Sequence, residues 1–171
     1  MIWYLNIKSH RYLSTGILFA ILTILAVSDV SATIDTDKFA ATILVYHRFG
    51  ESKYPSTNIR IDQFEKHIEE LTSGPYNVMP LEQVIQSFIK KRQLPRNTVS
   101  ITIDDAYRSI YTEAWPRLQK AKLPFTVFVA TDPVDRKSKN FMTWDQIREI
   151  KDGIATIGHH TASHLHMVTA S

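Results

Sequence analysis

The segment VSITIDDAYRS, residues 99–109, joins a strongly β-prone run to two adjacent carboxylates, Asp104 and Asp105. With Thr98 before it, the run predicts a buried strand over residues 98–104. A second segment, TIGHHTASHLHM at residues 156–167, holds four of the chain's seven histidines and also follows a β-prone run. Two groups of polar side chains therefore come after two different predicted strands.

Strands and helices alternate along the chain on both sides of residues 98–104. Periodicity predicts strands at 41–49, 76–81, 98–104, 125–130 and 154–161, helices at 61–71, 81–93, 107–122 and 143–152, and a loop at 131–140. Pro116 should kink or break the third helix, and Thr143 with Gln146 has the spacing of a capping box. The alternation indicates parallel strands with crossover helices, as an open doubly wound sheet or as part of a (β/α) barrel. Parallel strands carry functional residues at their carboxyl ends, so both polar groups are expected on one face.

Residues 1–32 have the pattern of a secretory signal peptide. Lys8, His10 and Arg11 precede an apolar run at residues 16–27, and Val30 and Ala32 supply small residues for cleavage. We expect cleavage after Ala32, which leaves one domain at residues 33–171, exported to the periplasm, the cell envelope or the medium. An uncleaved membrane anchor is the alternative, although the apolar run is shorter than the roughly 20 residues that a spanning helix needs.

Composition narrows the choice of partners. The chain of 171 residues is 44% hydrophobic and 22% charged, which fits one globular domain. Its net charge of +3 is spread along the sequence and does not indicate a nucleic acid or an anionic membrane as partner. The absence of cysteine excludes disulfide bonds and a lipid-modified cysteine.

The two polar groups together have the composition of a catalytic metal site. A metal that activates water takes three protein ligands, and His160 and His164 with one carboxylate would supply them. Their i, i+4 spacing would place both imidazoles on one side of a helical turn. Each motif alone has a commoner explanation: a surface or capping histidine pair, or an aspartate pair that caps a helix. Both motifs at matching strand ends favour the metal site.

The sequence resembles the polysaccharide deacetylases of carbohydrate esterase family 4 over about residues 41–171. The resemblance is carried by ILVYHRF (43–49), ITIDDAYRS (101–109), LPFTVFVA (123–130), FMTWDQIREI (141–150) and IGHHTASHLHM (157–167). It implies an α/β fold, a distorted (β/α) barrel, and an enzyme that removes N-acetyl groups from N-acetylglucosamine polysaccharides. It also implies a divalent metal, usually Zn²⁺.

The resemblance assigns a role to each matching residue. Asp105, His160 and His164 match the metal ligands, and Asp104 matches the general base. The backbone N–H of Tyr107 matches a donor to the developing oxyanion. His159 and His166 are expected to be bystanders or supporting residues, because three ligands already complete a catalytic site.

Two departures from the family pattern, beside a milder one at Ile103 in place of phenylalanine, bear on the site. Ala106 stands where the family has glycine, so the turn is strained or reshaped if that position needs a positive φ or a close approach of the backbone to substrate. The family's later strands, with their arginine segment and the Leu-x-His histidine that serves as acid, are missing, so the barrel is expected to be incomplete at its C-terminus. His47 is a candidate acid by resemblance to the branch acting on exported poly-N-acetylglucosamine, and a core-facing or supporting histidine is the alternative. A truncated, non-catalytic remnant that keeps the metal cluster is the alternative function.

Overall fold

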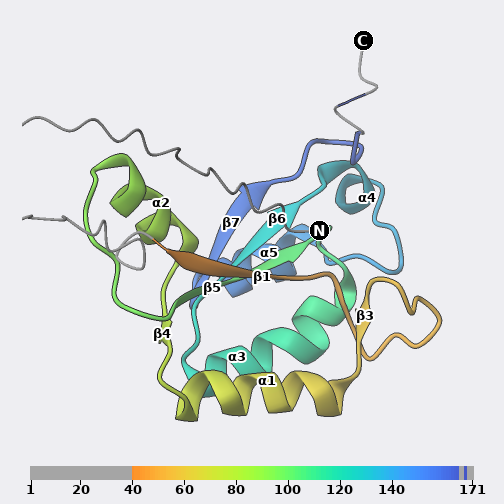
Figure 1. Ribbon diagram of the computed structural model, residues 1–171. Coiled ribbons are helices and arrows are strands. Elements are labelled where there is room, and N and C mark those ends of the chain that lie inside the picture. The colour runs from red at the N-terminus through yellow and green to blue at the C-terminus, as the bar shows by residue number, and fades with distance from the viewer. Residues whose placement is uncertain (1–39, 166–167, 169–171) are drawn as a thin grey trace, which may run out of the picture. The chain divides into compact units, whose positions relative to one another are not determined.

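The computed structural model describes residues 40–165 and 168, which form an α/β unit built on a parallel sheet (Figure 1). Its strands are β1 (Ala41–Tyr46), β4 (Asn77–Val78), β5 (Thr98–Asp104), β6 (Phe125–Val129) and β7 (Ala155–His159). They follow the order β1-β5-β6-β7, and β4 pairs with the start of β5. All the pairings of this sheet are parallel, as the sequence pattern predicts.

Helices follow the strands and supply the crossover connections. They are α1 (Ile61–Ser73), α2 (Leu81–Ile89), α3 (Trp115–Ala121), α4 (Thr131–Asp135) and α5 (Trp144–Lys151). A π-helical turn, η2 (Ile110–Ala114), runs directly into α3, which has Pro116 in its first turn. Proline lacks an N–H and clashes with the carbonyl four residues earlier, so the regular α-helix begins only around it. The short helix α4 lies in a segment for which the sequence predicted only a loop.

The register of β1 against β5 decides which side chains face the core. Leu44 pairs with Ile101 and Tyr46 with Ile103, so these residues share the face that packs against α1 and α3. There the ring of Tyr46 contacts Phe64 of α1 edge-on. Helices α1 and α3 lie side by side under this face of the sheet (Figure 1). The central strand β5 is thereby buried along most of its length.

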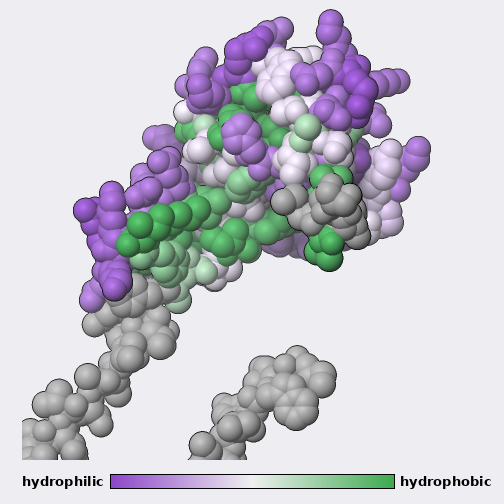
Figure 2. Space-filling model, turned by 90° about the horizontal axis from the view of Figure 1, so that it is seen from above, coloured by the Kyte–Doolittle hydropathy of each residue, from purple (hydrophilic) through white to green (hydrophobic). Residues whose placement is uncertain are grey.

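The opposite side of β1 is less covered. Ile43 and Val45 are exposed there, and α2 exposes Ile85, Phe88 and Ile89. Hydrophobic side chains form a band across the face of the molecule seen in Figure 2. Within the described residues β1 and β7 remain the two edges of the sheet, so these strands do not close into a barrel.

The predicted strand at 41–49 is interrupted in the structure. It divides into β1 and a short strand β2 (Arg48–Phe49), which leaves the main sheet to pair in parallel with β3 (Asn58–Ile59). His47 is the residue at the break. It therefore comes directly after β1, at the same end of the sheet as the carboxyl end of β5.

The predicted signal peptide at residues 1–32, and the domain boundary after it, lie outside the described residues. Within residues 40–165 and 168, none of the helices combines the length and the apolar character that a membrane span requires.

Candidate metal site and its surroundings

The site begins with an unusual turn at the end of β5. Asp105 and Ala106 both have left-handed backbone conformations, with φ of 75° and 61°. Two hydrogen bonds hold the turn, from the Asp105 N–H to the Phe128 carbonyl (3.0 Å) and from the Met142 N–H to the Ala106 carbonyl (2.9 Å). Such conformations cost on the order of 1–3 kcal/mol for each non-glycine residue and gather at functional sites. Position 106, where the resemblance implies glycine, thus has a positive φ, so of the two outcomes considered for Ala106 the backbone strain is the one present.

The turn brings the carboxylate of Asp105 against two imidazoles from beyond β7. Asp105 Oδ1 lies 3.4 Å from the Nε2 atom of His160 and 3.4 Å from the Nε2 atom of His164. One ligand atom from each of the three residues lies within 4.8 Å of the others. Asp105 is buried, whereas the side chains of His160 and His164 are 32% and 54% exposed, so the cluster opens to solvent on the histidine side.

The backbone at residues 160–165 is not helical, so the prediction of a helical turn is wrong. His160 ends the β7 ladder by donating its N–H to the carbonyl of Val129 (3.0 Å). Thr161 and His164 then adopt left-handed conformations, with φ of 61° and 56°. These reversals fold the loop back, and the two imidazole rings lie 4.7 Å apart, nearly perpendicular. A loop, rather than one side of a helix, therefore brings the pair together.

The donor set fits a divalent metal. Asp105 Oδ1 is buried and has no hydrogen-bond partner among the described residues, although an unpartnered buried carboxylate oxygen is costly. Two imidazole nitrogens and one carboxylate oxygen form a usual three-ligand set for a catalytic zinc ion. Ligands at zinc-binding distances in a tetrahedral arrangement are about 3.4 Å apart, a separation that the Asp105–histidine contacts already have. Cation binding would thus satisfy the orphaned oxygen.

Asp104 and His47 lie beside this cluster, at the ends of β5 and β1. His47 Nε2 is 3.8 Å from Asp104 Oδ2, and the two side chains are 31% and 19% exposed. His47 is therefore not a core-facing histidine. Both side chains are accessible to a ligand; Asp104 ends β5, and His47 directly follows the neighbouring strand β1.

The backbone of Tyr107 continues the turn. Tyr107 and Phe141 form an isolated antiparallel bridge whose hydrogen bonds are made by their neighbours, from Arg108 N–H to the Asn140 carbonyl (2.8 Å) and from Met142 N–H to the Ala106 carbonyl. The Tyr107 N–H takes no part in either bond. Burial, together with the negative charge of Asp105, raises the pKa of the Tyr107 phenol, and Arg48 opposes that rise.

Sequence reasoning missed Arg48, which is buried directly beside the site. Its guanidinium carbon lies 3.4 Å from the centre of the Tyr107 ring and 3.9 Å from that of Tyr54. His159, the last residue of β7, is exposed and is not part of the cluster. His166 lies outside the described residues. The only sequence signal for Arg48 was its position directly after His47.

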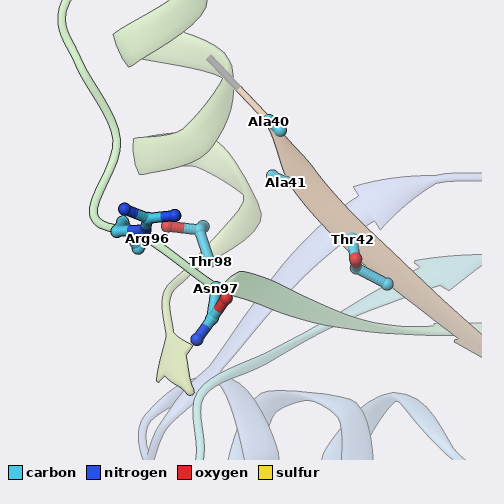
Figure 3. Close-up of a pocket in the computed structure, with 6 residues that line it drawn as sticks. All are labelled: Ala40, Ala41, Thr42, Arg96, Asn97 and Thr98. Atoms are coloured by element: carbon cyan, nitrogen blue, oxygen red, sulfur yellow. The ribbon is translucent and has the colours of Figure 1, made fainter. Parts of the chain in front are cut away.

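Two cavities lie at different ends of the sheet. One of about 230 Å³ is lined by Ala40–Thr42 and Arg96–Thr98, where β1 and β5 begin (Figure 3). It is at the far end of these strands from Asp104. Another, of about 420 Å³, is lined by His47 together with Ser56, Thr57 and Asn58. A ligand in this second cavity would contact His47, the one candidate site residue among its lining residues.

Comparisons with known proteins agree with this geometry. Residues 91–171 match the family model described as polysaccharide deacetylase. The putative polysaccharide deacetylase YxkH of Bacillus subtilis is 28% identical over 140 residues, which cover 81% of this chain and 49% of that protein. The poly-beta-1,6-N-acetyl-D-glucosamine N-deacetylase of Staphylococcus aureus is 30% identical over 110 residues, which cover 63% of this chain and 37% of that protein. The chain thus spans about half or less of these relatives.

Solved structures show the same fold. The deacetylase PplD of Streptococcus pyogenes, in complex with acetate, superposes with a TM-score of 0.69 at 23% identity, covering 77% of this chain and 60% of that one. IcaB from Ammonifex degensii superposes with a TM-score of 0.64 at 29% identity, covering 71% and 53%. The parallel sheet seen here is therefore part of the barrel-type fold expected from the sequence. The chain is thus similar in sequence and in fold to the polysaccharide deacetylases.

Proposed function

We propose that this chain carries the catalytic centre of a metal-dependent N-deacetylase that acts on N-acetylglucosamine polysaccharides. The observation that carries the proposal is the convergence of Asp105, His160 and His164 on one point, with Asp104 and His47 beside it. The staphylococcal relative is named for N-deacetylation of poly-beta-1,6-N-acetyl-D-glucosamine, which supports this class of substrate.

Asp105, His160 and His164 would hold the metal, which we propose to be Zn²⁺. Nitrogen and carboxylate ligands suit zinc, and three protein ligands leave a position for water or substrate. When bound, such an ion polarises the acetyl carbonyl and lowers the pKa of a water molecule. The burial of Asp105 favours binding, because an unpaired carboxylate oxygen there is otherwise unsatisfied.

Asp104 would act as the general base. It directly precedes Asp105 and remains partly exposed at the end of β5, which leaves its carboxylate open to a water molecule. In the reaction the water oxygen bonds to the acetyl carbon while Asp104 accepts a proton from that water. Adjacent aspartates can have separate tasks because the left-handed Asp105 turns its carboxylate toward the histidines.

The N–H of Tyr107 and the imidazole of His47 would complete the reaction. Attack on the carbonyl carbon develops negative charge on its oxygen, and a backbone N–H outside the bridge hydrogen bonds is a suitable donor to that charge. When the C–N bond breaks, the amine nitrogen needs a proton, which we assign to His47 on the other side of Asp104. The products are acetate and a free amino sugar.

We further propose that the protein is exported, with residues 1–32 as its cleaved signal peptide. The support is the basic start, the apolar run at residues 16–27 and the small residues before the expected cleavage site. An extracytoplasmic location would bring the enzyme to envelope or exported polysaccharide.

Acetate release tests the activity. The full chain is stripped of metal with a chelator, and N-acetylglucosamine oligomers are added with and without one equivalent of Zn²⁺. We expect acetate, measured by a coupled assay, together with an equal amount of free amine, only in the metal-loaded sample. A folded, metal-loaded chain that releases no acetate would instead support a non-catalytic remnant.

A further inference from the structure

We propose that Arg48 is a positioning residue, which holds the turn at residues 105–109 so that the Tyr107 N–H faces the reacting carbonyl. The inference rests on the proposed function, because it assigns a task to a residue beside that site. Arg48 touches neither the three ligand residues nor Asp104 in any contact found among the described residues, so its effect would pass through Tyr107.

Arg48 is buried between two aromatic rings. Its side chain is only 9% exposed, and the guanidinium lies against the rings of Tyr107 and Tyr54. A guanidinium stacked between two ring faces gains cation–π attraction and fixes the orientation of both planes. The ring of Tyr107 is also in contact with Phe141, with 4.8 Å between ring centres. Tyr107 is therefore held from two sides.

A hydrogen-bonded chain connects Arg48 to the far end of the same turn. Arg48 Nη1 donates to Glu51 Oε2 (2.8 Å), and Ser109 Oγ donates to Glu51 Oε1 (2.6 Å). Ser109 Oγ also accepts the N–H of Phe49 (3.2 Å), the residue after Arg48. Residues 48–51 thus contact the turn at two points: Arg48 stacks on Tyr107, and Phe49 and Glu51 form hydrogen bonds with Ser109.

The backbone of Arg48 is fixed as firmly as its side chain. Its N–H donates to the Thr57 carbonyl (3.0 Å), and β2 pairs with β3 at Arg48 and Asn58. His47 directly precedes this anchored residue. Arg48 therefore links the strand break that carries the proposed acid to the turn that carries the proposed oxyanion donor.

The arrangement requires arginine. Lysine could keep a charge near Glu51, but a compact ammonium cannot stack as a plane between two rings. Arg48→Lys should therefore retain the fold while loosening Tyr107. Arg117 supplies a matched control, because this arginine of α3 pairs with Glu65 and Glu113 away from the site.

The test compares R48K with R117K in the full chain. For acetate release from N-acetylglucosamine oligomers, we expect R48K to lower kcat by about 10- to 100-fold with little change in KM, because a misplaced oxyanion donor acts only in the transition state. Metal content and folded fraction, measured on the same samples, should be unchanged. R117K should keep the kcat of the parent chain. A folded R48K chain with parental kcat would overturn the proposal.

A second measurement does not depend on activity. Hydrogen exchange of the metal-free chain is followed by NMR at the Arg108 amide, which donates to Asn140 beside Tyr107. We expect about tenfold faster exchange in R48K and no change in R117K, since local opening of the turn becomes easier. Unchanged exchange in R48K would refute the positioning role. If the parent chain releases no acetate but R48K shows faster exchange, the proposed function fails while the coupling between Arg48 and the turn stands.

Discussion

The Nε2 atom of His47 lies 3.8 Å from the Oδ2 atom of Asp104, across the neighbouring carboxyl ends of β1 and β5. The distance is longer than a direct hydrogen bond, so the two side chains are not hydrogen-bonded to each other. A base and an acid that act in turn on one amide have to lie close to each other, but each must stay free to exchange a proton with water or substrate. The break of the first strand at His47 creates this arrangement.

His47→Gln should separate the two halves of the reaction. We expect the turnover of N-acetylglucosamine oligomers to fall by about 10²- to 10⁴-fold, because the amine leaves poorly without a proton. Hydrolysis of 4-nitrophenyl acetate should change little, since its leaving group needs no acid. Steady-state rates on both substrates check this. Equal losses on the amide and on the ester would show that His47 serves something other than proton donation.

The two adjacent aspartates should respond differently to the same substitution. Asp104→Asn is expected to leave metal content near that of the parent chain and to lower turnover by about 10²- to 10⁴-fold, as for loss of a general base. Asp105→Asn should lower metal affinity and turnover together, because Oδ1 of Asp105 is the oxygen that both imidazoles approach. Both variants are dialysed, and their metal content and their rate of acetate release are measured on the same samples. Metal loss in Asp104→Asn as severe as in Asp105→Asn would contradict the division of roles.

The histidines should also differ in their effect on metal binding when each is replaced. Replacing His160 or His164 by alanine should remove most of the bound metal, because each supplies one of three ligand atoms. His159→Ala is the matched control, since this neighbouring histidine is exposed and outside the cluster. Zn²⁺ titration of the stripped chain measures the difference. Similar losses at all three positions would indicate loose binding by a histidine-rich segment instead.

Much of this arrangement could be predicted from the sequence, because it depends on local patterns and on the geometry of parallel sheets. The strand at 98–104 and the capping box of Thr143 and Gln146 are present as predicted. Strands β5, β6 and β7 pair in parallel, so Asp105 and His160, which follow β5 and β7, lie at the same end of the sheet. The meeting of the two polar groups was therefore a consequence of fold class.

Long-range contacts and backbone conformations were not visible in the sequence. The spacing of His160 and His164 suggested a helical turn, but the preceding β7 ladder and two left-handed residues produce a loop. The pairing of β2 with β3, which breaks the first strand, joins segments with no shared periodicity. Nor does any local pattern encode the stacking of Arg48 on Tyr107. Such features arise from packing between segments, which propensity alone does not determine.

Export has a direct test in the mature amino terminus. We expect the processed protein to begin after Ala32, because Val30 and Ala32 stand at the two positions before the site where small residues are required. Mass spectrometry of protein from the expressing cells and their medium measures the first residue. A dominant species in the membrane fraction that still begins at Met1 would favour an uncleaved anchor.

The strained turn after β5 gives the last prediction, which concerns stability. Ala106 is completely buried with φ of 61°. A left-handed conformation costs an alanine roughly 1–2 kcal/mol, whereas a glycine adopts it freely. Ala106→Gly relieves this strain but loses a buried methyl group, worth about 0.8 kcal/mol. Glycine also gives the unfolded chain more backbone freedom than alanine, which costs about 0.4–1 kcal/mol. We therefore expect the free energy of unfolding to stay within about 1 kcal/mol of the parent value.

Ala114 is the matched control for this substitution. It is equally buried, but its φ of −74° is that of an ordinary helix. Ala114→Gly relieves no strain, and it loses both the methyl group and helix propensity, so it should cost about 2 kcal/mol. Urea unfolding of both variants at one metal concentration measures the two values. If Ala106→Gly destabilises the chain as much as Ala114→Gly does, the turn stores no strain. In that case the glycine expected by resemblance at this position would serve close approach of substrate rather than backbone conformation.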